Sequence, residues 1–273
     1  MTPRKTLGLL CGALIALGSL HAFQLPWREY PGVEYNDFEA PADYDEVTDW
    51  VFARMKYPPR PGAQFDYAGP RWAEGGSTWT QDYPRADRHF LTAVRRLTFI
   101  NARSVEQAVN FNDGDDVFNY PFLYAVRTGE WELTPEIIKK FREYIDRGGF
   151  FMTDDFWGDY QWDNFMRYFQ QVFPDRDVVD IPEDDQVFHN MYDLSERYQI
   201  YGSWGLGGGG QARGTVPYWR AVYDDHDRAV AVIYPNNDMG DSWEFADDPY
   251  YPERLSRMGI RLGINSIIYA FTH

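Results

Sequence analysis

Cysteine is almost absent from this 273-residue chain, which contains Cys11 and no other. Cys11 lies in an apolar stretch near the N-terminus that we expect to be removed from the mature protein. A mature chain without a thiol has no disulfide, no thiolate metal ligand and no cysteine nucleophile. Disulfide scaffolds, zinc sites built on cysteine and cysteine-dependent enzymes are therefore excluded for that mature chain.

Long hydrophobic runs are also absent, apart from the uncharged stretch at residues 7–20. Arg4 and Lys5 precede this stretch, and Ala22 after it is a small residue suited to cleavage. About 14 apolar residues are too few for a comfortable membrane span, and the pattern is that of a secretory signal. We therefore expect residues 1–22 to be a signal peptide of a periplasmic or secreted protein, without membrane insertion after signal removal. An uncleaved membrane anchor is the alternative.

Basic residues are few: 26 Lys and Arg stand against 42 Asp and Glu, and the formal net charge is −16. Loss of Arg4 and Lys5 with the signal peptide would make the charge still more negative. A surface this acidic repels phosphate backbones and anionic membranes. We therefore expect no nucleic-acid partner.

Aromatic residues, by contrast, are abundant, with 10 Trp, 20 Tyr and 19 Phe in the chain. Aromatic side chains fill large hydrophobic cores, and they also form stacking platforms for sugars or peptides. Composition alone leaves both interpretations open.

Hydrophobic periodicity predicts strands that alternate with helices. The expected strands are residues 47–55, 117–126 and 149–153, with a hairpin formed by 216–224 and 228–235. The expected helices are residues 85–98, 135–147, 160–172 and 253–271. This alternation is typical of a mainly parallel sheet with helices on both faces. We therefore predict one three-layer α/β domain at 47–273, preceded by an extended lead-in at 23–46 that is rich in proline and acidic residues.

Two adjacent carboxylates, Asp154 and Asp155, follow the expected strand at 149–153 and precede a helix. In sheets of this kind, ligands bind beyond the carboxyl ends of the strands. The pair is therefore a candidate acid/base couple or half of a metal site. Alternatively, one of the two caps the next helix while the other accepts hydrogen bonds from backbone amides.

A second acidic group, Asp238, Asp241 and Glu244, follows the last expected strand. If Asp238 faces Asp154, one ion or one sugar can bridge them, whereas a solvated loop with an Asx turn is the alternative. Neither group has calcium-loop spacing, and no histidine pair has zinc spacing. We therefore predict no metal and no cofactor.

Aromatic and polar side chains near these acidic groups are the candidate binding residues. They are Trp79, Asp82, Tyr83, His89, Trp157, Trp243 and Glu244. Among the histidines, His89 is the best placed, because it lies on an expected helix beside the turn at 82–84. The glycine run at 205–210 satisfies a dinucleotide-binding pattern, but no helix follows it, so we predict a mobile flap instead. Residues 202–205, GSWG, do not form a five-residue nucleophile elbow.

Six sequence blocks in a fixed order resemble a bacterial family known as domain of unknown function 4159. The blocks are WTQDYP at 79–84, NYPFLY at 119–124, REYIDRGGF at 142–150, DDFWG at 154–158, NDMGDSWE at 237–244 and RLGINSIIYA at 261–270. The resemblance covers about residues 47–272. The family is similar in fold to class I glutamine amidotransferases and ThuA-like proteins, which implies a flavodoxin-like sheet.

The resemblance also limits the chemistry. It places residues 153–155, Thr-Asp-Asp, where an amidotransferase has its nucleophilic cysteine, so glutaminase activity is not implied. Relatives tend to have a histidine near Asp185, and this chain has none at that position. Longer relatives join the domain to membrane helices and occur beside MoxR-type ATPases and von Willebrand factor A proteins. This association implies envelope-assembly partners.

Two functions from different classes agree with these observations. The first is an exported binding or scaffold domain of the cell envelope, with a saccharide or an envelope polymer as its ligand. The alternative is a hydrolase acting on a glycan or envelope polymer, in which Asp154 or Asp155 works with Asp238. His89 is a further candidate for a catalytic role in that hydrolase. Carboxyls of Asp154 and Asp238 about 5 to 9.5 Å apart around an open pocket would favour the hydrolase. Carboxyls turned onto backbone amides would favour the scaffold.

Overall fold

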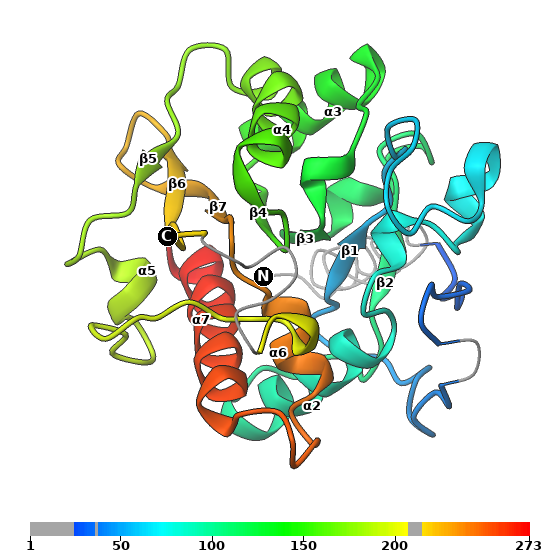
Figure 1. Cartoon of the computed structure of the whole chain (residues 1–273), viewed down its shortest axis with the longest axis vertical. Coiled ribbons are helices and arrows are strands. Elements are labelled where there is room, and N and C mark those ends of the chain that lie inside the picture. Colours follow the sequence, from blue (N-terminus) through cyan, green and yellow to red (C-terminus); the bar gives the residue numbers. More distant parts are fainter. Residues whose placement is uncertain (1–24, 36–37, 207–214) are drawn as a thin grey trace, which may run out of the picture.

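A seven-stranded sheet crosses the middle of the computed structural model, which describes residues 25–35, 38–206 and 215–273 (Figure 1). The predicted signal peptide and residues 207–210 of the predicted flap lie outside the described residues. The strands are β1 Ala53–Met55, β2 Gln107–Val109, β3 Phe122–Val126, β4 Phe150–Asp154, β5 Val179–Asp180, β6 Arg220–Tyr223 and β7 Ala229–Tyr234. Their order in the sheet is β2-β1-β3-β4-β7-β6-β5.

The sheet is mainly parallel, as the alternation of strands and helices predicts. β1 is parallel to β2 and β3, β3 to β4, and β4 to β7. β6 pairs with β7 and β5 in the antiparallel direction, which confirms the expected hairpin. Counted among themselves, the five parallel strands have the order 2-1-3-4-5, which is the flavodoxin-like order.

Helices cover both faces of the sheet and complete the three predicted layers (Figure 1). The α-helices are α2 Arg85–Leu97, α3 Pro135–Asp146, α4 Gly158–Val172, α5 Gln186–His189, α6 Met239–Glu244 and α7 Glu253–Thr272. The 3-10 helices are η1 Gly69–Glu74, η2 Thr78–Thr80, η3 Asp116–Asn119, η4 Thr128–Glu130 and η5 Ser203–Gly205. α2, α5, α6 and α7 pack on one face, and α3 and α4 pack on the other.

Each central strand contributes to two hydrophobic cores, because successive side chains of a strand point to opposite faces. In β3, Phe122 and Tyr124 face the α2 and α7 side, whereas Leu123 and Ala125 face α3 and α4. Burial on both faces explains why these strands appear in the sequence as continuous apolar runs. Much of the aromatic excess lies in these two cores.

The first strands differ from the prediction in their bounds. β1 contains only residues 53–55 of the expected 47–55, and Trp50 joins the sheet through a single bridge to Ala102. β3 begins immediately after Pro121, because proline has no N–H to donate to a neighbouring strand. β2 and β5, with three and two residues, are too short to produce a periodic pattern.

The described part of the lead-in has no helix or strand and lies against the domain. The N–H of Leu25 donates to Asp116 at 2.9 Å, and the N–H of Gly76 donates to the carbonyl of Pro31 at 2.7 Å. The lead-in therefore covers part of the domain. None of the helices in the described ranges combines the length and apolar character needed to span a bilayer.

Candidate functional site

The two acidic groups predicted from the sequence meet at one edge of the sheet. β4 and β7 are parallel neighbours, with Asp154 opposite Tyr234, so their carboxyl ends lie together. The N–H of Asp155 donates to the carbonyl of Asn237 at 2.9 Å, which joins the two segments directly. This edge is where ligands bind in parallel α/β sheets.

Asp154 is fully buried and supports the start of α6. One carboxylate oxygen accepts a hydrogen bond from the hydroxyl of Tyr124 at 2.8 Å, and the other accepts from the backbone N–H groups of Met239 and Gly240. Burial, together with the neighbouring charge of Asp155, raises the pKa of Asp154 to about 7. This carboxyl is thus turned onto backbone amides and does not line the cavity described below.

Asp155 points to a different environment. Its backbone has a φ of 51°, and its carboxylate accepts hydrogen bonds from the indole N–H of Trp157 at 2.6 Å and from Arg127 at 3.2 Å. Burial raises the pKa of Asp155, and the buried guanidinium of Arg127 opposes that increase. Asp155 is therefore a buried carboxylate held by two donors.

The second acidic group is a buried helix, so the solvated-loop alternative is wrong. Asp238 is the N-cap of α6, where its Oδ1 accepts from the N–H of Asp241 at 2.9 Å. Asp241 in turn accepts from the N–H of Ser203 at 2.5 Å. Burial, with the nearby charges of Asp155 and Asp241, raises the pKa of Asp238 well above its usual value.

A turn that precedes α2 brings Asp82 into the same place. Asp82 has a φ of 60° and is 1% exposed. The buried side chain of Arg54 holds this turn, because it donates to the carbonyls of Trp79 and Gln81 at 2.9 and 3.2 Å. Arg54 also forms a buried ion pair with Asp87 at 2.7 Å. The position of the Asp82 backbone is therefore set by the core.

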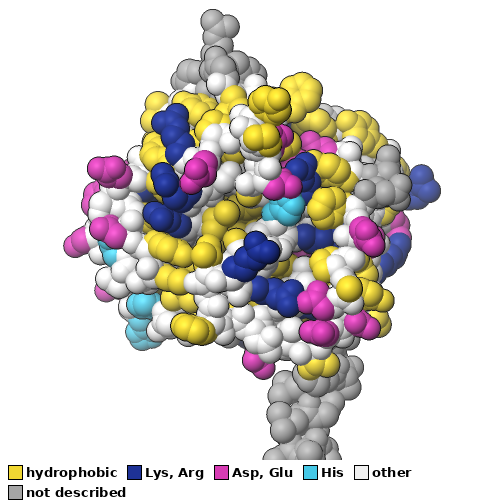
Figure 2. Space-filling view, turned by 90° about the horizontal axis from the view of Figure 1, so that it is seen from below, with side chains coloured by type: hydrophobic (Ala, Val, Ile, Leu, Met, Phe, Trp, Pro, Cys, Tyr) yellow, Lys and Arg dark blue, Asp and Glu magenta, His cyan; other side chains and the backbone are white. Residues whose placement is uncertain are grey.

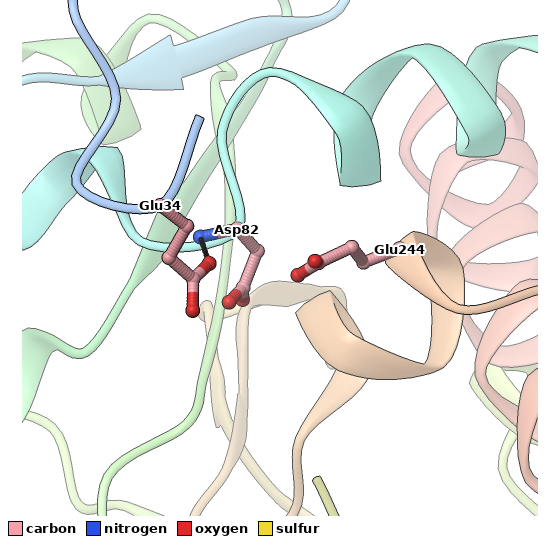
Figure 3. A group of neighbouring side chains, drawn as sticks. All are labelled: Glu34, Asp82 and Glu244. Atoms are coloured by element: carbon pink, nitrogen blue, oxygen red, sulfur yellow. Dashed lines mark hydrogen bonds between the residues drawn. The ribbon is translucent and has the colours of Figure 1, made fainter. Parts of the chain in front are cut away.

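Asp82 lies between two glutamates (Figure 3). The N–H of Asp82 donates to Glu34 of the lead-in at 3.1 Å. On the other side, Glu244 at the end of α6 accepts a hydrogen bond from the hydroxyl of Tyr35. Burial and the charge of Asp241 raise the pKa of Glu244 to about 8.

These carboxylates form two overlapping groups. One oxygen each from Asp82, Asp155 and Asp238 lie within 4.8 Å of one another, and the same holds for Glu34, Asp82 and Glu244. Asp82 belongs to both groups. We call the set of Glu34, Asp82, Asp155, Asp238, Asp241 and Glu244 the acidic cluster.

A cavity of ≈ 200 Å³ opens beside the acidic cluster. Its lining combines carboxylates, aromatic rings, one amide, one guanidinium and backbone. The lining residues are Glu34, Phe65, Gln81, Arg127, Asp155, Trp157, Gly202, Trp204, Gly205, Asp238 and Asp241. Trp204 is 90% exposed, so an exposed aromatic side chain borders the cavity.

The model of the family described as Domain of unknown function (DUF4159) matches residues 63–271. The chain belongs to this family. No curated protein matches the chain. The match includes every member of the acidic cluster of this DUF4159 domain except Glu34, which comes from the lead-in before it.

The structure separates the predicted site residues of the DUF4159 domain into two sets. Asp155, Trp157 and Asp238 line the cavity, and Asp82 and Glu244 lie in the acidic cluster beside it. The remaining predicted residues, apart from Asp154, are Trp79, Tyr83, His89 and Trp243, and none of them lines the cavity.

Trp79 and Trp243 are buried in the hydrophobic cores, and Tyr83 is buried outside them. Trp243 stacks on Phe90 with ring centroids 4.1 Å apart, and the indole N–H of Trp79 donates to a backbone carbonyl. The Nδ1 of His89 faces the carbonyls of Glu244 and Trp243 at 2.9 and 3.2 Å, so this nitrogen donates and holds the end of α6.

Sequence analysis did not identify several residues that line the cavity of the DUF4159 domain. Arg127 directly follows β3, and the strand-end rule that selected Asp154 would have found it. Glu34 and Phe65 belong to segments without periodicity, where the sequence carries no signal for their position. Trp204 lies in the GSWG segment at 202–205, which does not match a nucleophile elbow and carries no other signal for a site.

Proposed function

We propose that this domain binds a saccharide unit in the cavity beside the acidic cluster. Sugars present an apolar ring face and several hydroxyl donors, which match aromatic rings and carboxylate acceptors. The cavity offers Phe65, Trp157 and Trp204 together with Asp155 and Asp238. This combination of aromatic rings and carboxylates in one cavity is the observation that carries the proposal.

The volume of the cavity limits the size of the ligand. Sites for drug-sized molecules have about 300–1,000 Å³, and the cavity here has ≈ 200 Å³. It therefore suits one sugar unit, either free or at the end of a polymer, and excludes a longer oligomer. With the signal-like N-terminus, this ligand supports a role in the cell envelope, where assembly proteins would be the partners.

Hydrolysis of a glycan is the second candidate, because Asp155 and Asp238 border the same cavity with oxygens within 4.8 Å. This upper limit on the oxygen separation lies below the about 6.5–9.5 Å of inverting glycosidases, so the retaining arrangement, with about 5–5.5 Å, is the one to test. The raised pKa of Asp238 suits a general acid. Both oxygens of Asp155 already accept hydrogen bonds, which weakens a nucleophile, so binding is the better supported function.

Calorimetric titration of the full chain with neutral and amino monosaccharides tests the proposal. Trp204→Ala removes an exposed ring from the cavity, and we expect at least tenfold weaker binding. Tyr250→Ala is the matched control, because Tyr250 is equally exposed at 90% and does not line the cavity. The proposal fails if no sugar binds, or if Trp204→Ala binds as tightly as the control.

A separate assay decides between binding and hydrolysis. Release of reducing ends from glycan polymers would be measured for the wild-type protein and for Asp238→Asn. Turnover that Asp238→Asn abolishes would establish the hydrolase, and saccharide binding without turnover would establish the binding protein.

A further inference from the structure

We propose that the acidic cluster binds a hard divalent cation through carboxylate oxygens of Asp82, Asp155 and Asp238. The role of this ion, to hold sugar hydroxyls in the cavity, rests on the proposed function. The binding of the ion itself does not. The inference departs from the expectation of no metal, which was based on motif spacing.

The arrangement of the three carboxylates suits an ion in their middle. Oxygens on opposite sides of Ca²⁺ are about 4.6–5.2 Å apart, and those around Mg²⁺ are at most about 4.2 Å apart. The oxygens of Asp82, Asp155 and Asp238 lie within 4.8 Å of one another. With one oxygen from each residue inside this limit, the centre of the three oxygens lies within about 2.8 Å of each, close to a Ca²⁺–oxygen bond length.

An unpartnered oxygen provides the second, independent observation. Oδ1 of Asp82 accepts from the side-chain amide of Gln81 at 3.0 Å, but the buried Oδ2 has no hydrogen-bond donor among the residues that the structure describes. A buried carboxylate oxygen without a donor is unfavourable unless a cation or a proton satisfies it. Oε2 of Glu244 is unpartnered in the same way.

Two glycines, Gly202 and Gly240, leave room for the carboxylates of Asp238 and Asp82. A Cβ at Gly240 would lie 2.0 Å from Oδ2 of Asp82, and a Cβ at Gly202 would lie 2.3 Å from Oδ2 of Asp238. Glycine at these two positions thus allows these carboxylate oxygens to approach the backbone closely. Any other residue would push Asp82 and Asp238 out of their present positions.

The charge balance of the acidic cluster also calls for a cation. On the face that Figure 2 shows, basic and acidic side chains are interspersed. Within the acidic cluster, by contrast, the ion pairs found among the described residues include only Arg127 with Asp155. Glu34, Asp82, Asp238, Asp241 and Glu244 have no Lys or Arg partner in that part of the chain.

The chemistry of the ligands selects the class of ion. Every candidate ligand atom is a carboxylate oxygen, and oxygen ligands favour Ca²⁺, Mg²⁺ and Mn²⁺ over ions that prefer nitrogen or sulfur. We assign the ion to the group with Asp155 and Asp238, because both line the cavity. Three protein ligands leave coordination positions free for water or for the hydroxyls of a sugar.

The test is titration of the chelator-treated full chain with Ca²⁺, Mg²⁺ and Mn²⁺ separately, without saccharide, by calorimetry and thermal unfolding. We expect one ion per chain and a higher Tm with at least one of the three. Asp82→Asn should weaken binding at least tenfold and keep the fold, because Asn readily adopts the φ of 60° found at this position.

Asp238→Asn provides a second variant with a matched control. It should weaken ion binding as Asp82→Asn does, while Asn still caps α6. Asp185→Asn is the control, since Asp185 caps α5 in the same way through the N–H of Val187 and lies outside the acidic cluster. This control should bind the ion like the wild-type protein.

Two results would overturn the proposal. One is the absence of binding and of any change in Tm with millimolar ion, which would mean that protons satisfy the carboxylates. The other is unchanged ion binding by both Asp82→Asn and Asp238→Asn. Trp204→Ala separates the two proposals, because it should lose the saccharide and keep the ion.

Discussion

At the scale of single residues, Asp82 and Asp155 share the acidic cluster but have different surroundings. Asp155 faces the buried guanidinium of Arg127 at 3.2 Å, whereas Asp82 faces other carboxylates and has one oxygen without a donor in the described ranges. Loss of charge at the two positions should therefore have different consequences for the free energy of unfolding. At Asp155 it removes an attraction, and at Asp82 it removes a repulsion.

We predict that Asp155→Asn destabilises the metal-free protein by about 3 kcal/mol, because it removes the carboxylate that is paired with the buried guanidinium of Arg127. Asp82→Asn, measured under the same conditions, should be as stable as the wild-type protein or more stable. Urea unfolding in the presence of a chelator measures both. Equal unfolding midpoints for Asp155→Asn and the wild-type protein would contradict this account of the ion pair.

At the scale of elements, α6 is held by carboxyl groups at both ends. Asp154 accepts from the N–H groups of its first turn, and Glu244 is its last residue. Burial raises the pKa of Asp154 to about 7 and that of Glu244 to about 8. Both groups therefore keep a proton in the folded protein at pH values where the unfolded chain has released it.

Because the folded protein binds these protons more tightly than the unfolded chain, we predict that the metal-free protein becomes less stable as the pH rises from about 5 to about 8. The stabilisation from each raised pKa is complete below the unfolded value, near pH 4, and is lost as the pH approaches the folded value. One such proton corresponds to about 1.4 kcal/mol per pH unit.

Urea unfolding at several pH values, with a chelator present, measures the effect. Asp154→Asn should reduce the dependence on pH, because an amide does not titrate. A wild-type protein that is as stable at pH 8 as at pH 5 would show that these carboxyls do not retain their protons.

The sequence predicted those elements that are long enough to show a period. The strand at 150–154 and the helices at 85–97, 135–146 and 253–272 lie within one or two residues of the expected bounds. α6 escaped prediction because its six residues complete less than two turns, and all of them are buried, so no polar face marks it. The edge of the sheet was therefore predictable, but the shape of the site was not.

For the site residues, too, the sequence predicted their place at the edge of the sheet but not how their side chains are arranged. The end of β4 correctly indicated where Asp154 and Asp155 lie, but not which of the two faces the cavity. That choice depends on the positive φ of Asp155 and on Arg127, which are properties of the folded chain. Asp82 and Asp238 are separated by more than 150 residues, and motif spacing cannot detect ligands that only the fold brings together.

At the scale of the whole molecule, the lead-in closes one side of the acidic cluster. Glu34 accepts from the N–H of Asp82, and the hydroxyl of Tyr35 donates to Glu244 and accepts from Arg85 at 3.1 Å. The family match begins at residue 63, so these contacts come from outside the part that defines the family. The lead-in is thus a structural part of the site in this chain.

We predict that Tyr35→Phe lowers the free energy of unfolding by about 1–3 kcal/mol, because it removes the donor that the described part of the chain supplies to the buried carboxylate of Glu244. Tyr67→Phe is the control, since Tyr67 is exposed and should tolerate the loss of its hydroxyl. Chemical denaturation of the two variants measures the difference. Equal stability of Tyr35→Phe and Tyr67→Phe would mean that the lead-in contact has no energetic role.

Asp82, Asp155 and Asp238 come from three distant segments of the chain, and their separation links ion binding to the folded state. An unfolded chain cannot present the three carboxylates together, so the ion we propose would bind the native state alone. The free energy of unfolding of the domain would then increase with the concentration of that ion. In a compartment rich in the ion, the native state would have a higher free energy of unfolding. In a compartment poor in the ion, the same chain would unfold more readily.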